Sequence, residues 1–329
     1  MTDNWGLLGH DWAVDMLRQH IVHGAVRHAY LFTGPPGLGR RTLTLRFAQA
    51  LNCAQPSAPG EACRACRDCK HIASMQHPDL AVIRAEQEGG TLKVDQVRAV
   101  QRMLALKPYQ SRYRVALFLR FQEANPSAAN ALLKTLEEAP DHAILLLTAD
   151  NAEQLLPTII SRCEVLRLRP MPIESVEGYL RQRGADESTA RLVAHLSGGR
   201  PGYALRMLED PNTLDFRHQR LDDLRQLLSA SRVMKFEYAE KLGRDRDAMR
   251  QVLLLWLAYW RDVMLRAAQA DTPLANVDRA DEIETLAAGL SLIEARRLVS
   301  DLELAIERLE RYINARLLAE VLLLDWPHM

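Results

Sequence analysis

The chain has 329 residues, 48% of them hydrophobic and 26% charged, and this length is enough for two or three domains with sizeable cores. Lysine plus arginine and aspartate plus glutamate balance at 42 each, so no overall field attracts the chain to nucleic acid or to a membrane surface. The sequence has no run of about eighteen apolar residues, as a membrane span needs, and it does not begin like a signal peptide. We therefore expect a cytoplasmic protein.

The first part of the chain alternates strand-like and helix-like segments. Short apolar runs predict strands at 29–33, 80–84, 115–119, 143–148 and 164–168, and the spacing between them predicts helices at 42–51, 94–106, 126–138 and 155–163. Asn125 is a suitable N-cap for the helix over 126–138, and Pro126 suits its first turn. Strands separated by helices predict an α/β domain with a parallel sheet covered on both faces.

A glycine-rich loop, GPPGLGRRT, follows the first predicted strand and precedes a helix. In the P-loop pattern G-x-x-x-x-G-K-[ST], backbone N–H groups face phosphate oxygens. Here Arg40 stands at the lysine position and Arg41 at the position of the Mg²⁺-binding hydroxyl. The candidate nucleotide-contacting residues are Gly34, Gly37, Gly39, Arg40, Arg41 and Thr42. We expect a degenerate phosphate loop without productive nucleotide binding; the alternative is a tight turn that binds nothing.

The second element of a nucleotide site is also missing. Acidic residues that hold Mg²⁺ are expected at the end of the strand over 115–119. Arg120 and Phe121 occupy that place, and neither side chain coordinates Mg²⁺. Glu123 lies two residues further on and is a poor substitute. Two independent losses argue against ATP hydrolysis by this chain.

Four of the five cysteines lie close together in the sequence. Their spacing, Cys-x9-Cys-x2-Cys-x2-Cys, is typical of a structural zinc site with four thiolate ligands, here Cys53, Cys63, Cys66 and Cys69. The segment over about 52–72 is too short and polar for a core of its own, so the metal would supply its folding energy. His71 or His77 could replace one thiol, and the hypotheses that compete with zinc are an iron–sulfur cluster and unbound cysteines.

After the proline-rich residues 169–172 the pattern becomes helical to the end. Helices are predicted at 173–183, 187–196 and 203–208, and further helices from about 212 to 326. Apolar residues at three- and four-residue spacing illustrate the apolar stripe of this helical region: Leu298, Leu302, Ile306, Leu309, Ile313 and Leu317. The aromatic residues Trp256, Tyr259 and Trp260 suit either a core or an interface, and a core is the more frequent case.

Several segments together resemble the bacterial clamp-loader branch of the AAA+ proteins, over essentially the whole chain. They are HAYLFTGPPGLGR (28–40), HPDL (77–80), VDQVR (94–98), NALLKTLEEAP (130–140) and SRC (161–163). The inactive loop beside an intact SRC narrows the resemblance to the subunit of that branch that does not hydrolyse ATP. It implies a RecA-like AAA+ module over 1–168 that carries a zinc insertion at about 52–72. A helical lid over 169–210 and a helical collar over 211–329 would follow.

The resemblance also implies an activity and partners. Such subunits assemble with a delta subunit and ATP-binding tau/gamma subunits, and the pentamer loads the beta sliding clamp on primed DNA during replication. Arg162 is then the arginine that acts in trans on ATP held by a neighbouring subunit, a role that suits the always-charged guanidinium fork. A structural salt bridge at a helix end is the alternative for Arg162.

Two further positions follow from the same resemblance. Lys134 could be a second basic contact, although a solvated helix face is favoured. Active relatives carry a lid arginine that touches their own nucleotide, and its register here falls on Gly202, close to Arg200. This departure weakens ATP binding in cis further.

Two different functions stay open beside this one. The chain could be an active AAA+ ATPase with an atypical loop, in which Arg40 replaces the lysine. It could also be a zinc-dependent DNA-binding protein, but the balanced charge and the lack of a basic recognition helix argue against this.

Overall fold

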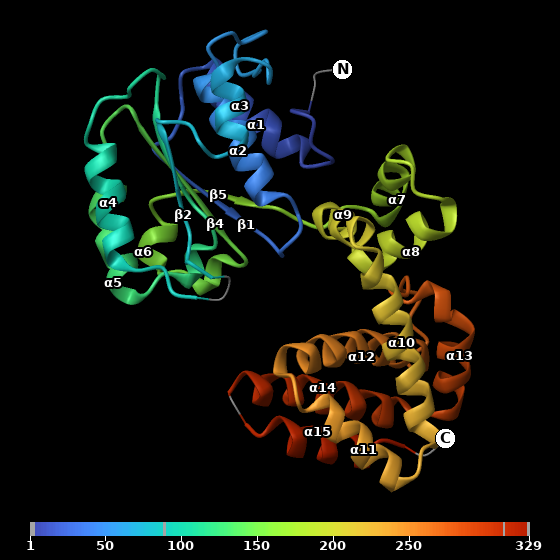
Figure 1. Cartoon of the computed structure of the whole chain (residues 1–329). Helices are drawn as coiled ribbons and strands as arrows, with labels where there is room; N and C mark the ends of the chain where they lie inside the picture. Colours follow the sequence, from blue (N-terminus) through green and yellow to red (C-terminus); the bar gives the residue numbers. More distant parts are fainter. Residues whose placement is uncertain (1–3, 88–89, 312, 328–329) are drawn as a thin grey trace. The chain divides into compact units, whose positions relative to one another are not determined.

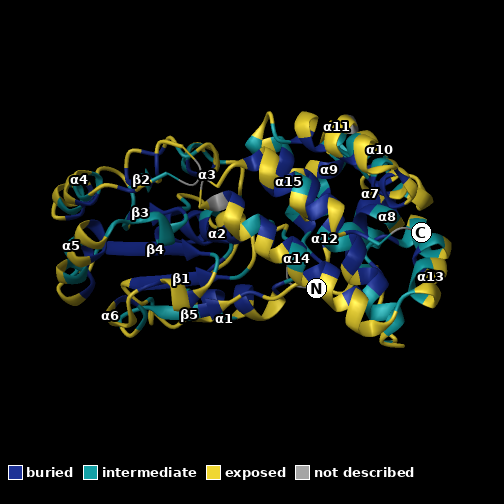
Figure 2. Ribbon diagram, turned by 90° about the horizontal axis from the view of Figure 1, so that it is seen from below, coloured by how far each residue is buried: buried dark blue, intermediate teal, exposed yellow. Residues whose placement is uncertain are grey.

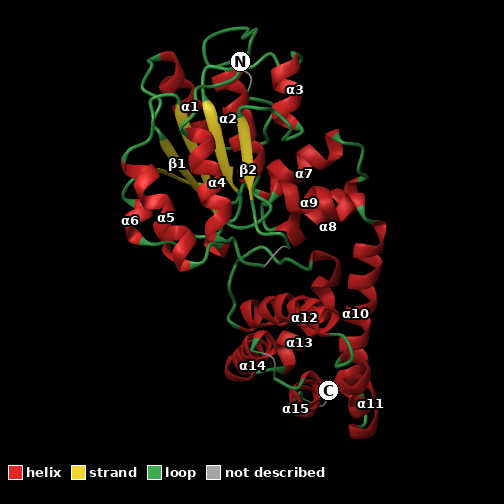
Figure 3. Ribbon diagram, turned by 60° about the vertical axis from the view of Figure 1, so that its left-hand side comes forward, coloured by secondary structure: helices red, strands yellow, loops and turns green. Residues whose placement is uncertain are grey.

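The computed structural model describes residues 4–87, 90–311 and 313–327. The chain forms two compact units. The first contains the residues up to Pro172 together with Gly199–Tyr203, and the second contains Ile173–Gly198 and the chain from Ala204 onward. Every strand that the structure describes lies in the first unit (Figure 3). Among the described residues, no helix is both long and apolar enough to span a membrane.

The first unit is built on a five-stranded parallel sheet, which confirms the predicted α/β fold. The strands are β1 (Ala29–Thr33), β2 (Leu80–Ile83), β3 (Arg114–Phe118), β4 (Ala143–Ala149) and β5 (Glu164–Arg167), in the order β2-β3-β4-β1-β5. Strand β4 lies between β1 and β3 and is buried along its whole length (Figure 2). Because helices cover both faces, the central strands are apolar at consecutive positions instead of alternating with polar residues.

In the described part of this unit, the sheet is accompanied by the helices α1 (Asp11–Val22), α2 (Arg40–Asn52), α3 (Arg67–Ala73), α4 (Val94–Leu104), α5 (Pro126–Glu137) and α6 (Pro157–Ile160). Helices α1–α3 lie on one side of the sheet and α4–α6 on the other (Figure 1). Successive side chains of a strand point to opposite faces. Accordingly, Tyr30 and Phe32 of β1 pack in the core with α1 and α2, whereas Ala29 and Leu31 pack in the core with α4 and α5.

The predicted helices agree with the observed boundaries to within about two residues, except in one place. Helix α5 begins at Pro126, and the Asn125 side chain accepts the Ala128 N–H at 2.7 Å, as expected of an N-cap. The predicted helix over 155–163 was too long, because α6 ends at Ile160 and the next residues turn into β5. Helices α1 and α3 had not been predicted.

Among its described residues, the second unit contains helices joined by loops and no strand. Its helices are α7 (Ile173–Gln182), α8 (Glu187–Ser197), α9 (Pro201–Glu209, whose first turn belongs to the first unit), α10 (Pro211–Ser229), α11 (Arg232–Leu242), α12 (Arg246–Ala267), α13 (Ala280–Gly289), α14 (Leu292–Glu310) and α15 (Ala315–Leu324). The division of this part into a lid and a collar remains a prediction.

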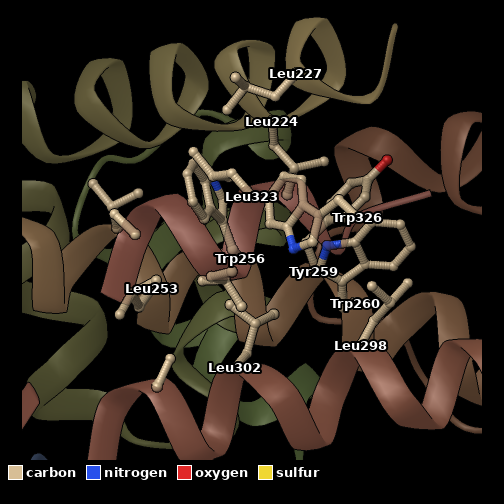
Figure 4. Packing of buried hydrophobic residues seen from close by; sticks show 14 of the residues in the cluster. Leu224, Leu227, Leu253, Trp256, Tyr259, Trp260, Leu298, Leu302, Leu323 and Trp326 are labelled. Carbon is tan, nitrogen blue, oxygen red and sulfur yellow. The ribbon is translucent and has the colours of Figure 1, made fainter. Parts of the chain in front are cut away.

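The core of the second unit is rich in tryptophan (Figure 4). Trp256 and Trp260 of α12 are fully buried, and their rings lie 4.9 Å and 6.1 Å from that of Trp326. The aromatic residues of this helix therefore form core. The predicted apolar stripe does not continue as one helix: α14 ends before Ile313, which is 41% exposed, and Leu317 at the start of α15 is 56% exposed.

Candidate functional site

The glycine-rich loop leaves the carboxyl end of β1 and is closed by the start of α9. Gly34 and Gly37 have φ values of 141° and 89°, which glycine adopts without steric cost. The N–H of Gly202 donates to the Gly37 carbonyl at 2.8 Å. A Cβ added to Gly202 would lie 2.9 Å from that oxygen. The position at which the resemblance expects a lid arginine thus leaves almost no room for a side chain.

Arg40, in the lysine position, bonds within its own chain. It is the first residue of α2 and only 8% exposed, and its Nη2 lies 2.5 Å from Oδ1 of Asp150, which directly follows β4. The backbone N–H of Gly34 also donates to the Asp150 carbonyl, at 3.2 Å. Arg41 and Thr42 are exposed. The guanidinium that could face a phosphate is therefore already paired with a carboxylate.

The end of β3 is likewise occupied by internal contacts. The Nε of Arg120 lies 2.5 Å from Oε1 of Glu123, so the Glu123 carboxylate is paired with an arginine. Phe121 is buried, with its ring edge-on to that of Phe118 at 5.4 Å. These residues hold the strand end in place, and their side chains offer no carboxylate free to bind Mg²⁺.

Arg162 lies at the opposite end of the sheet. It stands in the turn between α6 and β5, and Glu164 of β5 pairs with Tyr30 near the start of β1. The loop begins at Gly34, four residues after Tyr30, which is roughly 13 Å along a strand. Because the strands are parallel, Arg162 is separated from the loop of its own chain by the length of the sheet.

The Arg162 side chain is 35% exposed and has partners from two helices. Its Nη2 lies 2.6 Å from Oε1 of Glu137 at the end of α5, and its Nη1 donates to the Thr158 carbonyl at 3.0 Å. An ion pair this exposed contributes about 0–1 kcal/mol, so the guanidinium can also serve another anion. No sequence motif had singled out Glu137 as a partner. Lys134, on the same helix, is exposed, in line with the favoured interpretation of a solvated face.

The four clustered cysteines come together in space. One sulfur from each of Cys53, Cys63, Cys66 and Cys69 lies within 4.8 Å of the others. The Cys53 sulfur is 3.5 Å from that of Cys63 and 4.0 Å from that of Cys66. Tetrahedral zinc with Zn–S bonds of about 2.3 Å requires S···S distances of about 3.8 Å. The donor set therefore fits one zinc ion with no open coordination position.

The surroundings of three of these sulfurs act on their pKa values in opposite directions. Hydrogen bonds from the Cys66 and Ala65 N–H groups lower the pKa of Cys63 to about 6, whereas burial raises the pKa of Cys53 and of Cys69. A bound zinc ion would stabilise all four thiolates. The segment is joined to the N-terminal part of the unit, because the Arg18 Nε of α1 lies 2.7 Å from Oε1 of Glu61.

This combination defines a class of protein. The first unit is a RecA-like AAA+ module with a degenerate phosphate loop. Its parallel sheet has β4 between β1 and β3, a glycine-rich loop follows β1, Arg40 replaces the lysine, and Arg120 and Phe121 replace the acidic residues. The family model described as DNA polymerase III, delta subunit, matches residues 9–172, and the model of the C-terminal part of that subunit matches residues 211–328.

Individual relatives agree. The chain is 31% identical to DNA polymerase III subunit delta' of Pseudomonas aeruginosa over 319 residues, covering 92% of each chain. It is 30% identical to the delta' subunit of Escherichia coli K12 over 308 residues, covering 93% of this chain and 90% of the relative. The chain belongs to the family of DNA polymerase III delta' subunits. It is also 34% identical to the gamma/tau subunit of Mycobacterium bovis over 195 residues, covering 56% of this chain and 33% of that relative.

Proposed function

We propose that this chain is the non-hydrolysing subunit of a DNA polymerase III clamp loader and that it supplies Arg162 to ATP bound by a neighbouring subunit. The observation that carries this proposal is the separation of two arginines. Arg40 is buried in an ion pair at the loop, whereas Arg162 is accessible at the other end of the sheet. An arginine finger supplied in trans stabilises charge that develops on the transferred phosphoryl group.

The proposed partners follow from the family. The neighbour that holds ATP is a tau/gamma subunit, and a delta subunit completes the assembly. The complex acts in the cytoplasm, where it loads the beta sliding clamp on primed DNA. The paired Arg40 and Glu123 argue against an active ATPase with an atypical loop, since neither group is free for phosphate or Mg²⁺.

ATP turnover in the presence of Mg²⁺ tests this proposal. We expect no turnover by the purified chain and clamp- and DNA-stimulated turnover after tau/gamma and delta subunits are added. Substitution Arg162→Ala should reduce the stimulated turnover while the complex still assembles on a sizing column. Robust turnover by the chain alone, or full activity with the Arg162→Ala subunit, would contradict the proposal.

Zinc is proposed as the structural metal of the cysteine cluster. Metal analysis of the purified chain should find about one zinc per chain, because a four-thiolate site accommodates one tetrahedral ion. Substitution Cys66→Ser should lower both the zinc content and the melting temperature. The matched control is Cys163→Ser, which changes the cysteine outside the cluster and should leave the zinc content unchanged. A metal-free but equally stable protein would refute the assignment.

A further inference from the structure

The Arg162 guanidinium is held by hydrogen bonds from its two Nη atoms. Its Nη2 bonds to Oε1 of Glu137 at 2.6 Å, and its Nη1 donates to the Thr158 carbonyl at 3.0 Å and to Oγ of Ser161 at 3.4 Å. A guanidinium carries five N–H donors in a rigid fork. These three hydrogen bonds use the two Nη atoms and leave the Nε–H out. A phosphate oxygen can therefore approach while the Glu137 carboxylate stays in place.

Glu137 is itself well anchored. It is the last residue of α5, and the preceding Leu136 is 1% exposed. The Leu136 carbonyl forms a hydrogen bond of 2.9 Å with Nε2 of His28, the residue directly before β1. The backbone that carries Glu137 is thus tied to the residue that leads into β1. A carboxylate carried by this backbone restricts the positions that the long, flexible arginine side chain can adopt.

The charge of Glu137 is not explained by its own helix. The carboxyl end of a helix carries partial negative charge, which disfavours acidic side chains there. Helix α5 nevertheless ends in Glu137 and is followed by Glu138. Glu137 is paired with Arg162, whereas Glu138 takes part in none of the contacts to Arg162 described above. An acidic residue at a helix position that disfavours negative charge, paired with one specific arginine, indicates that the pair has a role.

We propose that Glu137 is a positioning residue for the trans-acting Arg162. Its carboxylate fixes one edge of the guanidinium and directs the remaining donors outward, toward ATP on the neighbouring subunit. The side chain then loses less conformational freedom when the transition state forms. This inference rests on the proposed function, because it needs Arg162 to act on bound ATP.

The test uses the assembled complex with Glu137→Gln, which keeps the size of the side chain and removes its charge. We expect kcat of the stimulated ATP turnover to fall on the order of tenfold, with KM for ATP unchanged, because a finger acts in the transition state. The matched control is Glu138→Gln, which removes the same charge from the neighbouring residue. It should retain turnover within about twofold, as expected of residues outside a coupled pair.

A double-mutant cycle separates positioning from a general structural effect. In a complex that carries Arg162→Ala, the further change Glu137→Gln should have no effect, because the group to be positioned is gone. An equal loss in both backgrounds would overturn the inference, as would unchanged or increased turnover with Glu137→Gln alone. If Arg162→Ala itself has no effect, the proposed function fails. If Arg162→Ala lowers the stimulated ATP turnover and Glu137→Gln leaves it unchanged, only the inference about Glu137 fails.

Discussion

The two ends of the sheet in the first unit each carry an arginine, and the two are held in opposite ways. At the carboxyl end, Arg40 is 9% exposed at its side chain and paired with Asp150. At the amino end, Arg162 is 35% exposed and paired with a carboxylate that is itself half exposed. The first arrangement closes a site, whereas the second leaves a charged group accessible. In the proposed function, the unit keeps a nucleotide-binding fold without catalysis and offers Arg162 to another chain.

The largest expected effect is on ATP turnover and comes from removing the arginine at the amino end of the sheet. Substitution Arg162→Ala should slow ATP turnover at the site it serves by on the order of 10³-fold, the lower range for an arginine finger. Because the side chain is exposed, the free energy of unfolding should stay within about 0.5 kcal/mol of wild type. Single-turnover measurements on the complex and urea unfolding of the chain check both parts. A large loss of stability would mean that Arg162 is mainly structural.

A second prediction breaks the ion pair at the carboxyl end. Substitution Asp150→Ala leaves the buried Arg40 without its carboxylate, and this should cost about 3 kcal/mol in the free energy of unfolding. The matched change at the amino end, Glu137→Ala, should cost less than about 1 kcal/mol because that pair is exposed. Urea unfolding of the two variants measures the difference directly. Equal costs at both ends would remove the contrast between a buried and an exposed pair.

A third prediction concerns a buried carboxylate at the amino end. Asp79, directly before β2, is fully buried and accepts the N–H groups of Tyr109, Gln110 and Ser111 at 2.6–3.0 Å. Burial alone would raise its pKa, but these hydrogen bonds and Arg114 hold the pKa below the ordinary value of 3.8. A carboxyl whose pKa is lowered by folding stabilises the protein above its ordinary pKa, and this contribution is lost as the pH falls through and below that value.

Substitution Asp79→Asn should therefore cost about 2 kcal/mol at pH 7, since an amide accepts fewer of these hydrogen bonds. The difference from wild type should shrink as the pH falls from 5 toward 3. Urea unfolding across this pH range is the measurement. A constant difference would show that the charge of Asp79 does not contribute.

The smallest expected effect concerns ATP binding at the glycine-rich loop. Substitution Arg40→Lys restores the P-loop lysine, but Asp150 and the Gly202–Gly37 contact remain in place. We expect no measurable ATP binding by titration calorimetry, for the wild type or for the variant. Tight binding by the variant would show that the lysine alone had been missing and that the closed loop opens readily.

The sequence by itself determined the elements and the chemistry that neighbouring residues encode. The apolar runs predicted all five strands, and the spacing of Cys53, Cys63, Cys66 and Cys69 predicted the sulfur cluster. The GPPGLGRR segment identified a loop without its lysine, and Asn125 and Pro126 marked the start of α5. Such features depend on periodicity, capping and short spacings, which act within a few residues.

Only the tertiary structure decided which charges pair and where apolar stripes end. Arg40 meets Asp150 across 110 residues, and Arg162 meets Glu137 across 25, because parallel strands bring distant segments to the same end of the sheet. The predicted stripe through Leu317 was divided because the chain starts a new helix at Ala315. The spacing of apolar residues shows which side chains could share one face of a helix. The packing of other elements determines which of these side chains are buried.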